Sequence, residues 1–154
     1  PNERQPRMKT MKYIIGSVSR GTMREEDLIP TFLDCIDQLG DAAQYRDDWK
    51  EIQEVEDEDD RMEQTSYFLN EDLFNALEQF APPYFYFGSH PGDGADYGFW
   101  LSEDALRDFD GLKVSDLSEV PADYSGEVLL VNDHGNTSLY AATEGKLEAI
   151  WELV

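Results

Sequence analysis

The sequence of 154 residues has little cysteine, few basic side chains and no long apolar run. Because Cys35 is the single cysteine, no disulfide can form within the chain, and one lone thiol is typical of a reducing compartment. No apolar run reaches the roughly 18 residues that a membrane-spanning helix needs. We therefore predict a cytoplasmic protein that has no membrane segment.

Basic residues are scarce relative to acidic ones. The chain has 12 lysines and arginines against 34 aspartates and glutamates, which gives a formal net charge of -22. A protein with this charge repels nucleic acid and anionic membranes and attracts cations and basic proteins. We expect its partner to be a basic protein surface, with no direct binding to nucleic acid or membrane. The sequence carries no pattern that determines the oligomeric state.

Hydrophobic residues make up 40% of the chain and aromatic residues 12%, which is enough for a packed core. The length favours a single domain. We predict that residues 1–10 are a flexible N-terminal segment, of which residues 1–7 are an artificial leader or an unprocessed upstream stretch. Residues 11–154 are then expected to form one α+β domain.

Three segments have the apolar spacing of amphipathic helices. The first is 27–39, with Asp27 as its N-cap and Pro30 in its first turn. The second is 42–55. The third is 70–80, for which Asn70 is the predicted N-cap and Leu73, Leu77 and Phe80 are predicted to pack on a sheet.

Other segments have the aromatic or β-branched residues and flanking turn signals of strands. A first strand is plausible in 11–18. An aromatic strand at 84–89 leads through a long loop rich in Gly, Pro and Asp to a return strand at 97–101. Three further strands form a meander at 127–131, 137–141 and 147–153. The predicted fold is α+β, with one mostly antiparallel sheet of about five strands and helices packed on one face.

Acidic residues are concentrated between positions 47 and 63. We define these ten residues as the acidic run: Asp47, Asp48, Glu51, Glu54, Glu56, Asp57, Glu58, Asp59, Asp60 and Glu63. Since like charges at close spacing oppose a helix, we expect the helix that begins at 42 to fray into an acidic loop near 57–62. The run either solvates the protein or forms a surface for a basic partner. It lacks the glycine that an EF-hand calcium loop requires.

Cys35 stands beside the apolar face of the first predicted helix. We interpret it as a small, partly buried hydrophobic residue. A nucleophilic cysteine needs a nearby base and electropositive surroundings, and this chain is strongly negative.

Two predicted turns contain residues that could bind a metal. His90, Asp93 and Asp96 lie in the loop between the aromatic strands, and Asp133 and His134 lie in a second turn. If the loops met, two imidazoles and three carboxylates could hold Zn²⁺ or Mn²⁺ and activate a water. These residue types are also common in ordinary turns, and no established metal-binding spacing is present. No cofactor is predicted for the preferred interpretation.

Two segments carry a resemblance to known proteins: SRGTMREEDLIPTFLD at 19–34 and GSHPGDGADYGFW at 88–100. They resemble pieces of uncharacterised small acidic proteins of phages and mobile elements, and they contain no known catalytic motif. The charge profile is also similar to that of nucleic-acid mimics such as anti-restriction and anti-CRISPR inhibitors. This second similarity concerns composition alone and assigns no residue a role.

Two functional hypotheses follow. The first, which we prefer, is a non-enzymatic acidic protein-binding module. In this hypothesis the acidic run imitates nucleic acid and occupies a basic surface of a nucleic-acid-binding protein involved in defence. The alternative is a small metal-dependent enzyme or ligand-binding protein that uses the loops of His90 and His134.

Overall fold

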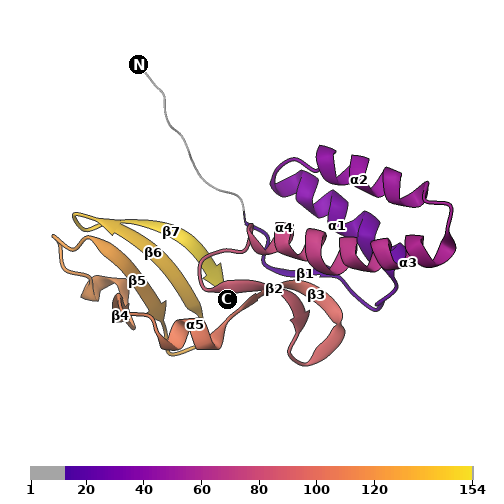
Figure 1. The fold of residues 1–154 in the computed structure, drawn as a ribbon. Helices are drawn as coiled ribbons and strands as arrows, with labels where there is room; N and C mark the ends of the chain where they lie inside the picture. The colour runs from indigo at the N-terminus through magenta and orange to yellow at the C-terminus, as the bar shows by residue number, and fades with distance from the viewer. Residues whose placement is uncertain (1–12, 154) are drawn as a thin grey trace, which may run out of the picture. The chain divides into compact units, whose positions relative to one another are not determined.

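The computed structural model describes residues 13–153, so the N-terminal segment 1–10 lies outside the described residues. The chain divides into two compact units, with the boundary between Ser102 and Glu103. The first unit combines helices with a small sheet, and the second is mainly a sheet (Figure 1). The predicted α+β class is confirmed. The predicted extent of one domain over 11–154 stays a prediction.

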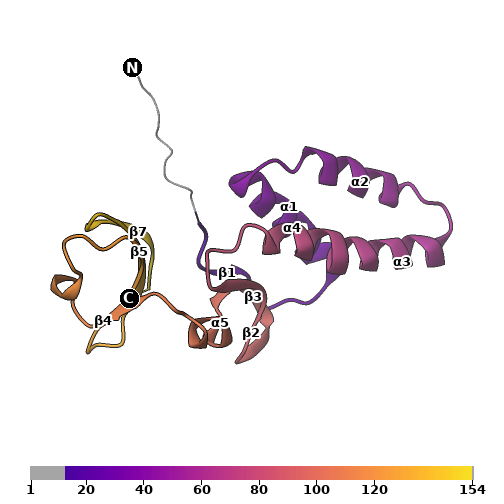
Figure 2. The ribbon, with the colours of Figure 1, turned by 60° about the vertical axis from the view of Figure 1, so that its left-hand side comes forward.

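The first unit contains three strands and a set of helices. The strands are β1 (Gly16–Ser19), β2 (Phe85–His90) and β3 (Asp93–Leu101), which form an antiparallel sheet in the order β1-β3-β2. The helices are α1 (Glu25–Leu39), α2 (Ala43–Gln53), α3 (Glu58–Tyr67) and α4 (Phe74–Glu78), with a π-helical turn, η1 (Phe68–Leu73), between the last two. Helix α1 contacts β1 and α4 contacts β2, whereas α2 packs on α1 and α3 (Figures 1 and 2).

Helix α1 confirms the helix predicted at 27–39 and begins two residues earlier than expected. Arg24 is at the N-cap position and makes no side-chain cap. Asp27 lies in the first turn, where it accepts a hydrogen bond from Thr22 Oγ1 at 2.6 Å. The expected cap at Asp27 is therefore wrong, and Pro30 lies one turn deeper in the helix than predicted. Three acids at 25–27 favour the earlier start because the helix N-terminus is electropositive.

The core of the first unit is aromatic. The Phe32 ring lies 5.7 Å from that of Phe74 and 5.2 Å from that of Phe87, in edge-to-face geometry. Phe87 also contacts Phe99, with 5.1 Å between ring centroids. Such pairs add to the free energy gained from burial. Since β2 alternates between the faces of the sheet, Phe85 and Phe87 are buried as their spacing predicts.

The helix predicted at 70–80 is the end of a longer helical segment that runs from Glu58 to Glu78 through η1. Leu73 and Leu77 are fully buried and Phe80 is half-buried, in line with the predicted core face. Asn70 is not an N-cap, because it lies inside η1 and its side chain donates a hydrogen bond to the Ser66 carbonyl at 2.9 Å. No Pro or Gly occurs in 58–80, so the local sequence contains no signal that would separate a helix at 70–80 from the helix before it.

The hairpin of β2 and β3 is tighter than predicted. His90 pairs with Asp93, so Pro91 and Gly92 alone form the turn, and β3 begins at Asp93 and not near 97. The long loop expected between the aromatic strands is therefore wrong. Gly98 allows β1 to approach β3 closely, since a Cβ at this position would collide with the Gly16 carbonyl.

The second unit contains a mixed four-stranded sheet. Its strands are β4 (Leu112–Val114), β5 (Gly126–Val131), β6 (Thr137–Thr143) and β7 (Lys146–Leu153), and they pair in that order. The chain enters through the short helix α5 (Glu103–Arg107), and a 3₁₀ turn, η2 (Leu117–Glu119), follows β4. β5, β6 and β7 confirm the predicted meander, whereas β4 pairs parallel to β5 and was not predicted.

The prediction of a single sheet of about five strands is wrong in the number of sheets. The described strands form two sheets, of three and four strands, with β2 and β3 in one and the meander in the other. Strand pairing depends on contacts between segments distant in sequence, which hydrophobic alternation does not specify. β1, which overlaps the strand predicted in 11–18, and the unpredicted β4 complete the two sheets.

Candidate functional site

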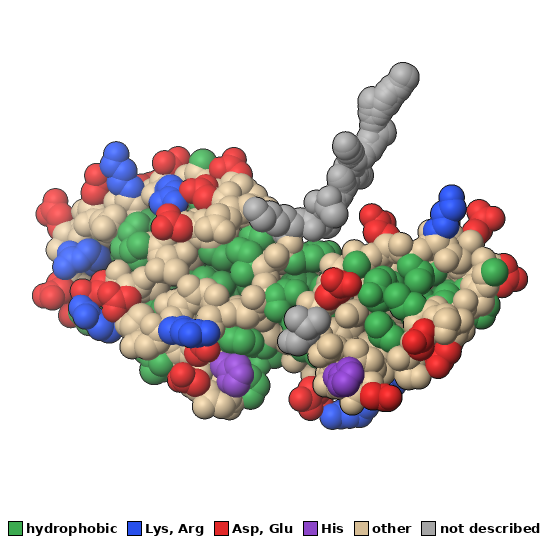
Figure 3. Space-filling model, turned by 180° about the vertical axis from the view of Figure 1, so that it is seen from behind, with side chains coloured by type: hydrophobic (Ala, Val, Ile, Leu, Met, Phe, Trp, Pro, Cys, Tyr) green, Lys and Arg blue, Asp and Glu red, His purple; other side chains and the backbone are tan. Residues whose placement is uncertain are grey.

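The acidic run lies on the hairpin of α2, the connection at 54–57, and α3. Nine of its ten residues are exposed and Asp48 is half-buried. Residues 43–78 hold thirteen acidic and three basic side chains, a formal charge of -10. Figure 3 shows one face of the chain, on which acidic side chains lie along the rim of the helices with basic side chains among them.

The acidic loop predicted at 57–62 is wrong, because these residues begin a helix. The Asp57 side chain caps α3 by accepting a hydrogen bond from the Asp60 N–H at 2.9 Å. Glu58, Asp59 and Asp60 fill the first turn. Acids in this position interact favourably with the N–H groups and the positive end of the helix dipole, which outweighs their mutual repulsion. The run is therefore held on defined backbone.

Two arginines of this region hold its helices in place, one within the hairpin and one against α1. Arg61 Nη1 donates to the Val55 carbonyl at 2.8 Å, which fastens α3 to the connection before it. Arg46 of α2 forms ion pairs with Asp34 and Asp37 of α1 at 2.8 and 2.7 Å. The hydrogen bond from Arg46, together with one from the Ala42 N–H, lowers the pKa of Asp37.

These arginines leave the acidic run uncompensated. Within residues 13–153, none of its ten carboxylates forms an ion pair with a lysine or arginine. The arrangement therefore offers a dense set of mostly exposed carboxylates, of which Asp48 accepts a hydrogen bond from the Gln44 side chain and Asp57 accepts one from the Asp60 N–H. Chemically, it can bind cations or the lysines and arginines of another protein.

A pocket of about 430 Å³ borders the acidic run between α2 and the helix of α3 and η1, and sequence reasoning missed it. Its walls are Ile52, Glu63, Gln64, Tyr67, Phe68 and Asp72. Phe68 is buried and stacks on Trp49 of α2, with 5.8 Å between ring centroids and 5° between planes. Tyr67 is 63% exposed, which is unusual for a large aromatic side chain. The available sequence signal was the adjacent aromatic pair Tyr67-Phe68 directly after the acidic run.

The π-helical turn η1 shapes this pocket, since it contributes Phe68 and Asp72. Asp72 is an exposed residue, but partial desolvation raises the pKa of its carboxyl above the usual value, and the charges of Asp48 and Glu71 raise it further. π-helical turns are rare and occur frequently at functional sites. No sequence pattern that we used distinguishes a π turn from an α turn.

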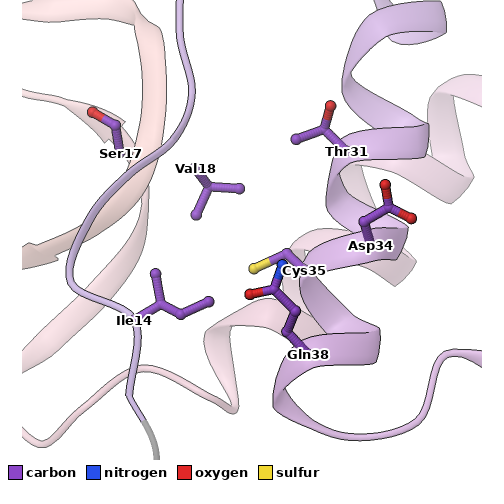
Figure 4. Close-up of a pocket in the computed structure, with 7 residues that line it drawn as sticks. All are labelled: Ile14, Ser17, Val18, Thr31, Asp34, Cys35 and Gln38. Carbon is purple, nitrogen blue, oxygen red and sulfur yellow. The ribbon is translucent and has the colours of Figure 1, made fainter.

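A second pocket, of about 420 Å³, lies between β1 and α1 and is lined by Ile14, Ser17, Val18, Thr31, Asp34, Cys35 and Gln38. The sulfur of Cys35 is turned toward Ile14 and Val18 (Figure 4). Cys35 is 4% exposed, and burial raises the pKa of its thiol to about 11. It is buried more fully than predicted, as a hydrophobic residue would be.

We expect Cys35 to react slowly with thiol reagents in the native protein. The raised pKa lowers the thiolate fraction near pH 8 by about a hundredfold relative to an unfolded chain, and the thiolate is the reactive form. Labelling with a chromogenic disulfide, with and without denaturant, measures the two rates. A native rate within a factor of ten of the denatured rate contradicts a buried structural thiol.

The residues of the alternative site at His90 serve the hairpin. The His90 Nδ1 accepts a hydrogen bond from the Gly92 N–H at 2.9 Å, and its ring meets the Trp100 ring edge-on at 4.7 Å. Asp93 accepts from the Ala95 N–H at 3.1 Å. Asp96 lies 3.9 Å from Arg20, and its Oδ1 is buried without a hydrogen bond. The contacts of His90 and Asp93 are those of a hairpin turn, whereas Asp96 lies within β3.

The other two residues of the alternative site, Asp133 and His134, lie in the turn between β5 and β6 of the second unit. The His134 N–H donates to Asn132 Oδ1 at 2.9 Å, and both side chains are exposed. Within residues 13–153, no group of three or more His, Cys, Asp or Glu residues is arranged to hold a metal ion. The metal site stays a prediction.

Replacing His90 and His134 together with alanine tests that alternative. We expect the free energy of unfolding to change by no more than the ~0.5–3 kcal/mol usual for point changes, because both side chains are exposed. Elemental analysis of the purified protein before and after the change measures metal content. Stoichiometric Zn²⁺ or Mn²⁺ that disappears in the double variant supports the enzyme hypothesis.

Comparison with protein-family models, with curated protein sequences and with solved structures finds no match for this chain. No helix in residues 13–153 is both long enough and apolar enough to cross a bilayer.

Proposed function

We propose that this chain is a non-enzymatic, acidic protein-binding module. Its acidic run occupies a basic surface of a partner, and the partner is a nucleic-acid-binding protein whose site the run imitates. One observation carries the proposal: ten carboxylates stand on a capped helical hairpin without an ion pair to any residue in 13–153. A flexible acidic tail would have the same charge without this defined placement.

The charge density of the hairpin supports mimicry of nucleic acid. Ten carboxylates occur within seventeen residues. An α-helix rises 1.5 Å per residue, so the run carries roughly one charge per 2.5 Å of helix. Duplex DNA carries about one charge per 1.7 Å of its axis. Since α2 and α3 lie side by side, the spacing along the hairpin is closer still (Figures 1 and 2).

Placement in a helical hairpin also reduces the entropic cost of binding. The Asp57 cap, the Arg61 contact with Val55 and the stacking of Trp49 on Phe68 fix the two helices before a partner arrives. A disordered acidic segment pays to order its backbone when it binds, and an ordered one does not. We therefore expect tighter binding than net charge alone provides.

A displacement experiment tests the proposal. A fluorescently labelled DNA duplex is bound to each of a panel of basic DNA-binding proteins, and the chain is added while anisotropy is recorded. We expect the chain to release DNA from at least one of them at a concentration at least about tenfold below that needed for polyglutamate of equal net charge. If the chain never surpasses polyglutamate across the panel, the mimic proposal is wrong.

A further inference from the structure

We propose that the pocket between α2 and η1 receives an arginine side chain of the partner. This inference rests on the proposed function and specifies how the acidic surface selects its partner. The pocket combines an apolar floor, an exposed aromatic wall and two carboxylates, whereas the described lining of the pocket at Cys35 has no aromatic residue and one carboxylate. This combination, and not acidity alone, distinguishes the pocket from the rest of the acidic surface.

The floor of the pocket is suited to the aliphatic stem of a long side chain. Ile52 and Phe68 line it, and the Trp49 ring stacks parallel on Phe68. Arg and Lys bury their methylene stems along apolar surface while the charged head stays with polar groups. The volume of about 430 Å³ is within the range of pockets that accept ligands.

The walls of the pocket favour a guanidinium over an ammonium. Tyr67 lines the pocket and is 63% exposed, and a planar guanidinium stacks on exposed aromatic rings. Glu63 stands one turn before Tyr67 on α3, and Asp72 lies in η1. Neither carboxylate forms an ion pair or accepts a hydrogen bond within residues 13–153, so both can accept the paired N–H groups of arginine.

The environment of Asp72 is consistent with a cationic ligand. Desolvation and the neighbouring charges of Asp48 and Glu71 disfavour its ionised form, as the direction of its pKa shift shows. A bound guanidinium offsets all three effects, because it supplies both a positive charge and hydrogen-bond donors. In the unbound chain these carboxylates repel one another, and this repulsion is relieved on binding.

Peptide titrations test the inference with defined probes. Nona-arginine and nona-lysine have equal charge, and isothermal titration calorimetry gives the Kd of each for the full chain. We expect nona-arginine to bind at least about fivefold more tightly, since stacking on Tyr67 favours the guanidinium. Tyr67→Ala should remove this preference, and Tyr67→Phe should retain it because the ring face is unchanged.

A pair of charge-matched variants separates the pocket from the rest of the surface. Glu63→Gln with Asp72→Asn removes two charges from the pocket, and Glu54→Gln with Asp59→Asn removes two exposed charges outside it. We expect the pocket variant to lose at least about tenfold in affinity for nona-arginine and the matched variant less than about threefold. All four residues are exposed, and far-UV circular dichroism checks that each variant is folded.

The outcomes distinguish this inference from the proposed function. Equal losses in the two variants, with no arginine preference in the parent chain, overturn the pocket and leave the acidic surface in place. If neither variant weakens nona-arginine binding, and the chain also fails to displace DNA, both proposals are wrong. A loss confined to the pocket variant, together with the effect of Tyr67→Ala, supports the arginine site.

Discussion

Neutralising the acidic run should slow association with a basic partner by about ten- to a hundredfold at low salt, since electrostatic steering accelerates encounter by factors of this size. The variant replaces six residues by their amides: Glu54, Glu56, Asp57, Glu58, Asp59 and Asp60. The partner is the DNA-binding protein that the displacement experiment identifies. Stopped-flow fluorescence at several salt concentrations gives the association rate constant, and we expect its dependence on salt to flatten because six charges are gone.

The structure allows this variant to keep its fold. Asn caps a helix about as well as Asp, so Asp57→Asn preserves the contact with the Asp60 N–H. Loss of the charges at 58–60 removes a favourable interaction with the helix dipole and also removes mutual repulsion, and these two effects oppose each other. We expect an unchanged far-UV circular dichroism spectrum.

A control variant with the same net charge separates placement from total charge. It replaces six exposed acids of the second unit by amides: Glu103, Asp108, Asp110, Asp123, Asp133 and Glu148. We expect its association rate to stay within about threefold of that of the parent chain, because steering acts mainly through charges near the contact. Equal rates in the two variants would mean that the acidic run is only a solubilising segment.

Phe32→Ala should lower the free energy of unfolding of the first unit by about 3–5 kcal/mol. Phe32 has 0% exposure and lies at the centre of the ring contacts with Phe74, Phe87 and Tyr97. The change removes the ring that α1 places against α4 and the sheet. It leaves a cavity that the surrounding rigid core fills only in part. Urea unfolding followed by far-UV circular dichroism measures the loss.

Met62→Ala is the matched control for this change. Met62 lies on α3 and is 61% exposed, so its truncation creates no cavity. We expect its effect to stay within about 0.5 kcal/mol, the usual range for surface positions. A loss below about 1 kcal/mol for Phe32→Ala would show that the aromatic cluster contributes far less to stability than its burial indicates.

The acidic run shows how far local reasoning extends toward the site. Its location, its residues and its exposure follow from composition, because charged side chains stay in water unless they are paired. The loop predicted at 57–62 is wrong, because the prediction considered repulsion between neighbouring acids and neglected the N-cap hydrogen bond of Asp57. The signal was present in the sequence as Asp57 with three acids after it, which is a favourable helix start.

The pocket at Tyr67 could not be predicted in the same way. Its walls come from α2, α3 and η1, and they meet because Trp49 stacks on Phe68 and η1 interrupts the regular helix. Glu63 and Asp72 are ordinary surface acids when the sequence is considered alone. The packing of two helices gives them a shared apolar floor.

By itself, the sequence determined the α+β class, the helix at α1, the alternation of β2, the meander of β5, β6 and β7, and the excess of negative charge. Each of these depends on periodicity or composition within a short stretch of chain. The tertiary structure alone decided the division into two sheets, the parallel pairing of β4 with β5, the two-residue turn at Pro91 and Gly92, and the π turn beside the pocket. The two sheets and the pairing of β4 depend on which distant segments meet, and that choice is made by packing contacts that no local pattern encodes. The hairpin turn and the π turn are local in sequence, but residue types alone do not distinguish them from a longer loop and an α turn.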